Sequence, residues 1–188
     1  MLSPMASDRS HLPRLQRGLY QGLAAVHWTI CLEDRVTGWL DELFHARFRE
    51  VMVHACARQG CVCPAYCLMP DHMHLLLAGI REDADLYLAA RFLRKHLEPV
   101  LAVGRFQKQG FDHVLREEER ARDAFAGVCH YVLQNPVREG LCDDASEWRF
   151  SGSVIPGFPD LRIHKEGYWE LYWRICHRLT TAATGTAP

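Results

Sequence analysis

The feature that most constrains the fold is an apolar stretch divided by a turn signal. Residues 63–69 are mostly apolar and end at Pro70 and Asp71, two residues that are typical of tight turns. A second apolar run follows at residues 72–77. The pattern predicts a strand, a tight turn and a second strand that begins with a histidine.

Two histidines lie one residue apart in the second predicted strand, His72 and His74. Because side chains alternate between the faces of a strand, both imidazoles point to one face, and Met73 and Leu75 point to the other. Such a pair can hold a divalent metal ion. The alternative is that the histidines only form hydrogen bonds within a sheet.

A second group of polar side chains lies further along the chain, in the segment YVLQNPVREGL at residues 131–141. Tyr131 and Asn135 are spaced i, i+4, which places a phenol and an amide oxygen on one helix face. Asn135 precedes Pro136 and is therefore disfavoured in helical geometry. Gln134 is the alternative amide at this position.

Together the two segments resemble the HUH single-tyrosine transposases, and specifically the REP-associated tyrosine transposases. The resemblance rests on MPDHMHLLL at residues 69–77 and on YVLQNPVREGL, and it covers roughly residues 26–151. Asp71 stands where the family usually has asparagine. It is interpreted as a turn residue, and a role near a metal ion is the alternative.

The resemblance implies a metal-dependent single-stranded DNA endonuclease and strand transferase that acts on DNA containing a hairpin. His72, His74 and Asn135 are then the metal ligands, and Tyr131 is the nucleophile that forms a 5′-phosphotyrosine intermediate. The expected ion is Mg²⁺ or Mn²⁺, because imidazole suits manganese while phosphate and water offer the oxygens that magnesium prefers. The alternatives are a domesticated protein that binds DNA hairpins without cutting, and a metal-dependent phosphodiesterase without a covalent intermediate.

The order of the predicted elements is strand, helix, strand, strand, helix, strand. The strands are expected at residues 23–32, 63–69, 72–77 and 106–115, and the helices at 39–58 and 84–100. Asp83 is the expected cap of the second helix. This order is that of an α+β, ferredoxin-like fold, also used by RNA-recognition domains, with a four-stranded antiparallel sheet and two helices on one face.

In such a sheet the first and third strands are central, so the histidines lie in the middle of the face that the two helices leave open. A further helix at residues 120–134, ended by Pro136, is expected to cross that face and to bring Tyr131 to the metal ion. The tyrosine-bearing helix is thus an addition to the ferredoxin-like fold.

The chain is expected to have three parts: a flexible arm at residues 1–22, a catalytic domain at 23–151 and an extension at 152–188. The extension contains a predicted amphipathic helix at residues 166–179, rich in aromatic side chains. Its expected role is to cover an edge of the core. The alternative is an aromatic surface on which unpaired bases stack.

The composition, 48% hydrophobic and 24% charged residues in a chain of 188, is that of a soluble globular protein. No run approaches the roughly 20 apolar residues of a membrane span, and residues 1–18 lack the apolar segment of a signal peptide. A cytoplasmic location is therefore expected. The eight cysteines do not form repeated CxxC pairs, so reduced, mostly buried thiols are expected rather than structural zinc.

The net charge is −1, so a protein of this sequence that binds nucleic acid must concentrate its basic residues on part of its surface. A solvated surface of mixed charge is the alternative for each basic group. Single-stranded DNA with a hairpin is the expected partner, and both a monomer and a homodimer remain open. The candidate DNA-binding residues are Arg91, Arg94, Lys95, Arg105, Lys108, Arg116, Arg120 and Arg138.

Overall fold

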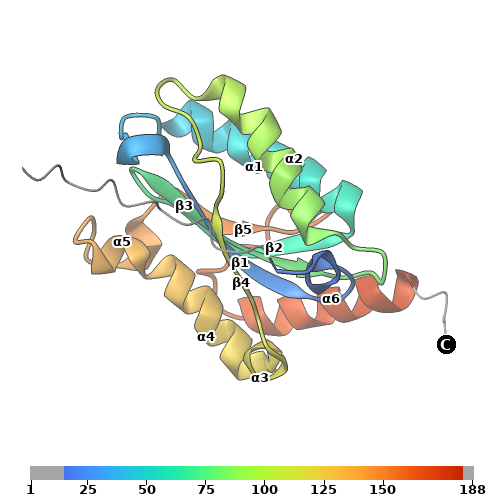
Figure 1. Ribbon diagram of the computed structural model, residues 1–188. Helices are drawn as coiled ribbons and strands as arrows, with labels where there is room; N and C mark the ends of the chain where they lie inside the picture. Colours follow the sequence, from blue (N-terminus) through green and yellow to red (C-terminus); the bar gives the residue numbers. More distant parts are fainter. Residues whose placement is uncertain (1–14, 184–188) are drawn as a thin grey trace, which may run out of the picture.

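The computed structural model describes residues 15–183, and the predicted hairpin lies at its centre (Figure 1). Strand β2 (Cys61–Leu68) pairs antiparallel with strand β3 (His72–Gly79). The backbone N–H of Met69 donates to the carbonyl oxygen of His72 at 2.8 Å and closes the turn between the strands. The hairpin prediction is confirmed.

Three more strands complete a five-stranded antiparallel sheet in the order β4-β1-β3-β2-β5. They are β1 (Ala25–Cys31), β4 (Phe111–Val114) and β5 (Ser151–Val154). The four predicted strands are confirmed in ferredoxin-like order, with β1 and β3 inside the sheet. Strand β5 was not predicted, because the short sequence Ser-Gly-Ser-Val has no apolar alternation.

Strand β4 is shorter than the predicted range of residues 106–115. Phe106 forms only an isolated bridge to Leu32, outside the named strands. Gly110 lies just before β4, and a Cβ atom there would be 3.0 Å from the carbonyl oxygen of Thr29. The chain thus approaches β1 closely at Gly110, where a side chain would crowd the backbone.

Helices α1 (Glu42–Gln59) and α2 (Leu86–Leu97) cover one face of the sheet (Figure 1). Helix α1 ends where predicted, because Gly60 adopts the left-handed conformation with φ 64°. The predicted cap of α2 was wrong. Asp85 accepts the capping hydrogen bond from the Leu88 N–H, whereas both carboxylate oxygens of Asp83 are bound by Arg81.

The sheet is buried on both faces, which explains why every residue of β2 is buried. Between the sheet and helices α1 and α2 lies a core that includes Met73, Leu75 and Leu77. The opposite face packs against α4 (Arg122–Leu133) and α6 (Tyr168–Ala183), with Leu76 in this second core. The predicted placement of a tyrosine-bearing helix on the face left open by α1 and α2 is confirmed.

Two details of these helices differ from the prediction. Pro136 does not end helical structure but lies in the first turn of a further short helix, α5 (Asn135–Arg138), where its missing N–H is tolerated. Helix α6 is longer than predicted, and Tyr168 and Tyr172 are buried, in agreement with a packing role. Buried rings cannot stack on unpaired bases, so that alternative is wrong for these two tyrosines.

The predicted flexible arm lies partly outside the described residues. Within the described part, Arg17–Tyr20 forms a short 3-10 helix, η1, and the Tyr20 ring is buried. The Tyr20 hydroxyl donates to the Asp112 carboxylate at 2.5 Å, and Arg17 forms an ion pair with Asp85 at 2.8 Å. The structure therefore differs from the prediction at residues 17–20, which are packed against the fold.

The remaining short helices connect the larger elements. They are η2 (Glu33–Arg35), η3 (Glu98–Val100), α3 (Glu117–Arg120) and η4 (Ala145–Glu147).

Among residues 15–183, no helix combines the length and the apolar character needed to cross a membrane.

Gly79 at the end of β3 gives a test of this packing. A Cβ atom at Gly79 would lie 1.9 Å from the carbonyl oxygen of Gly22, so Gly79→Ala requires the backbone to move. We expect this variant to lose about 3 kcal/mol of unfolding free energy in chemical denaturation. The control Gly127→Ala adds a methyl group in open space within α4 and should gain about 0.5–1 kcal/mol. Equal effects of the two substitutions would contradict the packing at Gly79.

Candidate active site

The two histidines of β3 face each other at the start of the strand. Their Nε2 atoms are 3.0 Å apart, and their rings are nearly perpendicular at 83°. Two ligand atoms at right angles on an octahedral ion, each about 2.1 Å from it, are also about 3.0 Å apart. The spacing of His72 and His74 therefore fits two adjacent coordination positions of one metal ion.

The other ring nitrogen of each histidine is held by a polar group. The Nδ1 atom of His72 lies 2.6 Å from a carboxylate oxygen of Asp71, which can only accept a hydrogen bond. The Nδ1 atom of His74 lies 3.1 Å from the hydroxyl of Thr29 and 3.2 Å from Nε2 of His27. Asp71 requires the hydrogen of His72 on Nδ1, which leaves its Nε2 lone pair free, and the same holds for His74 when Thr29 accepts from its Nδ1.

Asp71 therefore contacts the histidine pair directly, besides lying in the turn. Its second carboxylate oxygen accepts a hydrogen bond from Arg35 at 2.9 Å. Partial burial acts to raise the pKa of Asp71, but the hydrogen bond from His72 and the charge of Arg35 outweigh it and hold the pKa below its usual value. The resulting carboxylate can orient the His72 ring.

His27 on β1 belongs to this cluster and was missed in the sequence analysis. Its ring stacks on His74 with centroids 5.3 Å apart and meets the Tyr131 ring edge-on at 6.1 Å. Alternation along the first predicted strand could have found it. Val26 and Trp28 are apolar and lie in the core under α1 and α2, so alternation places His27 on the other face of the sheet.

Burial keeps two of these imidazoles neutral. Desolvation lowers the pKa of His74 to about 3, and the neighbouring His72, His27 and Arg138 add to the effect. Desolvation also lowers the pKa of His27 to about 4. A neutral imidazole has the lone pair that a metal ion needs, so His74 is available as a ligand throughout the neutral pH range.

Tyr131 lies near the C-terminal end of α4 and is 47% exposed, whereas the next two residues, Val132 and Leu133, are buried. The guanidinium of Arg138 lies 4.9 Å from the centre of the Tyr131 ring. The phenol is thus open to an incoming molecule, with a cation on its ring face and His27 at its edge.

Asn135 is buried just beyond this tyrosine. Its side-chain nitrogen donates to the carbonyl oxygens of Tyr131 and Val132, both at 3.0 Å. Pro136 has no N–H with which to bond Val132 four residues earlier, and the Asn135 amide replaces that donor. Its Oδ1 atom takes no part in these two bonds, and among the described residues no hydrogen bond orients the Gln134 side chain in this way.

The histidine pair needs ligands of another kind to complete a metal site. Within the described part of the chain, no group of three or more His, Cys, Asp or Glu side chains is arranged to hold a metal ion. The donors present are two imidazoles and the Asn135 amide oxygen, which suit Mn²⁺ and, with water or phosphate oxygens, Mg²⁺. All eight cysteines are free thiols, and burial raises the pKa of several, including Cys67 to about 12.

The candidate DNA-binding residues do not form one patch. Arg91, Lys95 and Arg105 lie on the α2 side of the sheet, opposite the histidines. The Arg94 guanidinium donates to backbone carbonyls of the neighbouring loop, including that of Lys108, whose own side chain is exposed.

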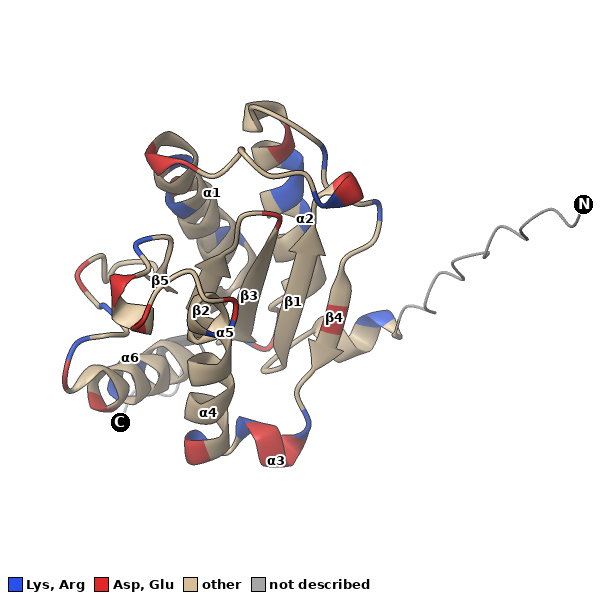
Figure 2. Ribbon diagram, turned by 90° about the vertical axis from the view of Figure 1, so that its left-hand side faces the viewer, with Lys and Arg blue, Asp and Glu red and all other residues tan. Residues whose placement is uncertain are grey.

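The basic residues nearer the tyrosine helix are also divided. Arg116 and Arg120 flank three glutamates of α3, which form a strongly acidic segment in Figure 2. Arg120 donates to the carbonyl oxygen of Leu23 at 3.3 Å. Of the predicted set, only Arg138 contacts a residue of the histidine and tyrosine cluster in an interaction described above.

Comparisons with known proteins agree with these motifs. The family model "Transposase IS200 like" matches residues 21–87, which include the histidine pair but end before Tyr131. A Haemophilus influenzae protein named as a REP-associated tyrosine transposase is 25% identical over 162 residues, which cover 72% of this chain and 89% of that protein. The resemblance to these transposases is confirmed.

A solved structure of a REP-associated tyrosine transposase bound to a REP hairpin has the same fold. Its TM-score is 0.61 at 21% identity, and the match covers 76% of this chain and 81% of that chain. The likeness extends beyond the segment matched by the family model, and it supports the order of strands and helices described above.

The neutral histidines predict how stability depends on pH in metal-free buffer. An unfolded histidine binds its proton near pH 6.5, whereas His27 in the folded protein binds it near pH 4. Between these values the unfolded chain holds more protons, so the free energy of unfolding falls as the pH falls, by at most ~1.4 kcal/mol per pH unit for each such histidine.

We expect His27→Gln to make this slope shallower between about pH 6 and pH 4.5, as measured by chemical denaturation at several pH values. His54 is exposed on α1, and His54→Gln is the matched control that should leave the slope unchanged. A slope that is equally steep in the His27 variant would show that this ring is not held neutral.

Proposed function

We propose that this chain is a metal-dependent single-stranded DNA endonuclease and strand transferase that links itself to DNA through Tyr131. The observation that carries the proposal is the histidine pair, with Nε2 atoms 3.0 Å apart and both Nδ1 atoms held, beside an exposed phenol. The match to the family model and to the named relative supports the same chemistry.

His72 and His74 would hold the metal ion, together with the Oδ1 atom of Asn135 and water. A bound Mg²⁺ or Mn²⁺ ion polarises the scissile phosphate and stabilises the charge that develops on its oxygens. Asp71 and Thr29 keep the two imidazole rings in the orientation that directs Nε2 at the ion.

Tyr131 would supply the nucleophile. Its hydroxyl oxygen forms a bond to phosphorus as the bond from phosphorus to the 3′-oxygen breaks, so one phosphoester replaces another. The 3′-oxygen leaves as a hydroxyl by taking a proton, and the phenolic proton passes to solvent at this exposed position. The same hydroxyl, or that of another strand, can later attack the phosphotyrosine, so strand transfer needs no ATP.

Help for the phenol is needed because a tyrosine in water titrates near pH 10. Forming its anion at pH 7 costs about 4 kcal/mol. Arg138 lies against the Tyr131 ring and brings a positive charge to the place where the phenolate and phosphate charges meet.

The proposed substrate is single-stranded DNA that contains a hairpin. The solved neighbour is described as bound to a REP hairpin, which supports the same class of ligand here. An unpaired strand is also flexible enough to bring a phosphorus in line with a phenol that is held on a helix over a sheet. A protein that binds such hairpins without cutting is the second candidate, and the solved neighbour described as bound to a hairpin agrees with it equally well.

The nucleophile can be tested with single-stranded hairpin DNA and Mn²⁺. Tyr131→Phe should abolish the covalent protein–DNA adduct on denaturing gels and leave the free energy of unfolding within about 0.5 kcal/mol of wild type, because an exposed hydroxyl is lost. Tyr66→Phe is the contrasting control. The Tyr66 hydroxyl is buried and bonded to His45 and Arg49, so that variant should lose about 1–3 kcal/mol of stability and keep the adduct.

An adduct that persists in Tyr131→Phe would refute the assignment of the nucleophile. Hairpin binding by the wild type without any adduct, in either metal ion, would favour the non-cleaving alternative.

The metal site can be tested without measuring cleavage, by titrating Mn²⁺ and following the signal of the free ion by electron paramagnetic resonance. His72→Ala should weaken Mn²⁺ binding beyond detection, and Asp71→Ala should weaken it about 10–100-fold. His113→Ala is the control, because that histidine lies on β4 and is bonded to Glu119. Unchanged Mn²⁺ affinity in His72→Ala would exclude the proposed site.

A further inference from the structure

The His27 ring contacts both halves of the candidate active site, the histidine pair and the tyrosine. Its Nε2 atom lies 3.2 Å from Nδ1 of His74, and its ring meets the Tyr131 ring edge-on, with the two planes at 82°. The chemistry proposed for Tyr131 and the histidine pair gives this ring no task. Its position connects the proposed nucleophile to a proposed metal ligand through a single side chain.

The register of β1 with β3 explains how His27 reaches His74. Thr29 pairs directly with His74, whereas His27 pairs with Leu76, two residues further along β3. His27 and His74 are therefore diagonal neighbours on one face of the sheet, a separation that aromatic side chains can bridge. Their rings are stacked with an interplanar angle of 28°. The contact thus follows from strand pairing and does not depend on a loop.

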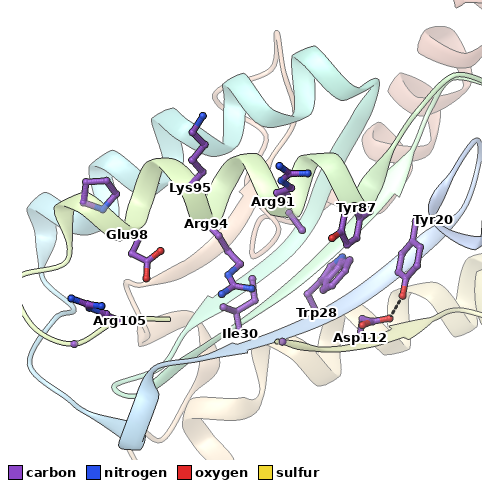
Figure 3. Close-up of a pocket in the computed structure, with 14 residues that line it drawn as sticks. Tyr20, Trp28, Ile30, Tyr87, Arg91, Arg94, Lys95, Glu98, Arg105 and Asp112 are labelled. Atoms are coloured by element: carbon purple, nitrogen blue, oxygen red, sulfur yellow. Dashed lines mark hydrogen bonds between the residues drawn. The ribbon is translucent and has the colours of Figure 1, made fainter. Parts of the chain in front are cut away.

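The opposite face of β1 holds the strand in place. Trp28 and Ile30 point away from the histidines, into the pocket beside α2 that Figure 3 shows. The Trp28 ring stacks on Tyr20 with centroids 5.6 Å apart, and the Tyr20 hydroxyl donates to Asp112, the β4 residue that pairs with Trp28. Because these contacts hold β1 from behind, the strand presents His27 in a defined position.

The contact with His74 bears on which of its ring nitrogens carries the hydrogen. A metal ion on Nε2 needs the lone pair of that nitrogen, so the hydrogen has to lie on Nδ1. The Thr29 hydroxyl, 3.1 Å from Nδ1, can either donate or accept, and by itself it does not select between the two tautomers. An acceptor nitrogen on His27 does select, because two facing lone pairs would repel each other at 3.2 Å.

The contact with Tyr131 bears on where the phenol points. The Tyr131 ring is 47% exposed, and an exposed aromatic side chain can normally occupy more than one rotamer. Here the ring has His27 on one side, in a favourable edge-to-face arrangement, and the Arg138 guanidinium 4.9 Å from its centre. The two contacts together favour one orientation of the phenol before DNA is bound.

We propose that His27 is a positioning residue that aligns Tyr131 with the metal ligand His74. Its Nε2 atom accepts the hydrogen of His74 Nδ1 and so keeps Nε2 of His74 open to the metal ion, while its ring supports the phenol. His27 acts through these two residues and not on the DNA itself. This inference rests on the proposed function, to which it adds the group that joins the nucleophile to the metal site.

Two substitutions separate the two contacts. His27→Phe keeps a ring against Tyr131 but removes the acceptor, so the affinity for Mn²⁺, measured by electron paramagnetic resonance without DNA, should fall about 10–100-fold. When Mn²⁺ is raised until the weakened site is saturated, its rate of adduct formation should return to within about threefold of wild type. His27→Gln keeps an acceptor that can reach His74 but removes the ring. Its Mn²⁺ affinity should stay within about threefold of wild type, while its rate of adduct formation in saturating Mn²⁺ should fall by about tenfold or more.

The matched controls are His54→Phe and His54→Gln, at an exposed position on α1, which should change neither property. Wild-type Mn²⁺ affinity in His27→Phe, or a wild-type rate of adduct formation in His27→Gln, would overturn the inference. Equal losses of both properties in both variants would also overturn it, because the ring would then only support the fold. A wild-type protein that forms no adduct would refute the proposed function and this role with it, whereas an active wild type with unaffected His27 variants counts against the role of His27 alone.

Nuclear magnetic resonance of the ¹⁵N-labelled protein, loaded with Mg²⁺, tests the position of the hydrogen without any cleavage. Nδ1 of His74 should be protonated and Nε2 of His27 unprotonated, two states that the nitrogen chemical shift distinguishes. The His27 signals are identified by their loss in His27→Gln. A hydrogen on Nε2 of His27 would overturn the proposed contact with His74.

Discussion

The candidate site depends on β3 being buried on both faces. Met73 and Leu75 enter the core under α1 and α2, while the intervening His74 faces α4 on the other side. A strand with one face in water would leave these imidazoles hydrated and free to protonate. Because α4 and α6 close the second face, desolvation holds His74 neutral, and the same closure limits the ligands that can reach it.

Neighbouring strands then determine how the imidazoles are oriented. Register places Thr29 of β1 opposite His74, and the turn between β2 and β3 places Asp71 beside His72. The Nδ1 atom of each histidine thus has a partner that lies outside β3. For His72 it is Asp71 in the turn, and for His74 it is Thr29 on β1. A one-residue slip of β1 would move Thr29 and His27 to the other face and remove both contacts to His74.

Local patterns were enough to predict the elements that build this arrangement. The turn at Pro70 and Asp71, the stop at Gly60 and the spacing of Tyr131 from Asn135 each depend on residues close in sequence. What was missed depends on pairing over long distances. Strand β5 has little apolar pattern and exists because β2 offers it a partner, and His27 joins the cluster only through the register of β1 with β3. The cap of α2 is a local exception: Asp85 accepts from the Leu88 N–H, while Asp83 is bound by Arg81 two residues earlier.

The Asn135-Pro136 pair closes the C-terminal end of α4, next to Tyr131. Proline removes the N–H that would have bonded Val132, and the Asn135 amide nitrogen supplies the missing donor while also bonding Tyr131. That use of the nitrogen leaves only the oxygen for a metal ion, so one side chain can close the helix end and present a ligand. Because the same amide holds the carbonyl of Tyr131, the position of the proposed nucleophile is coupled to the position of the proposed third ligand. An amide one residue earlier, at Gln134, would lie on a different side of the helix and would not fill the gap that proline creates.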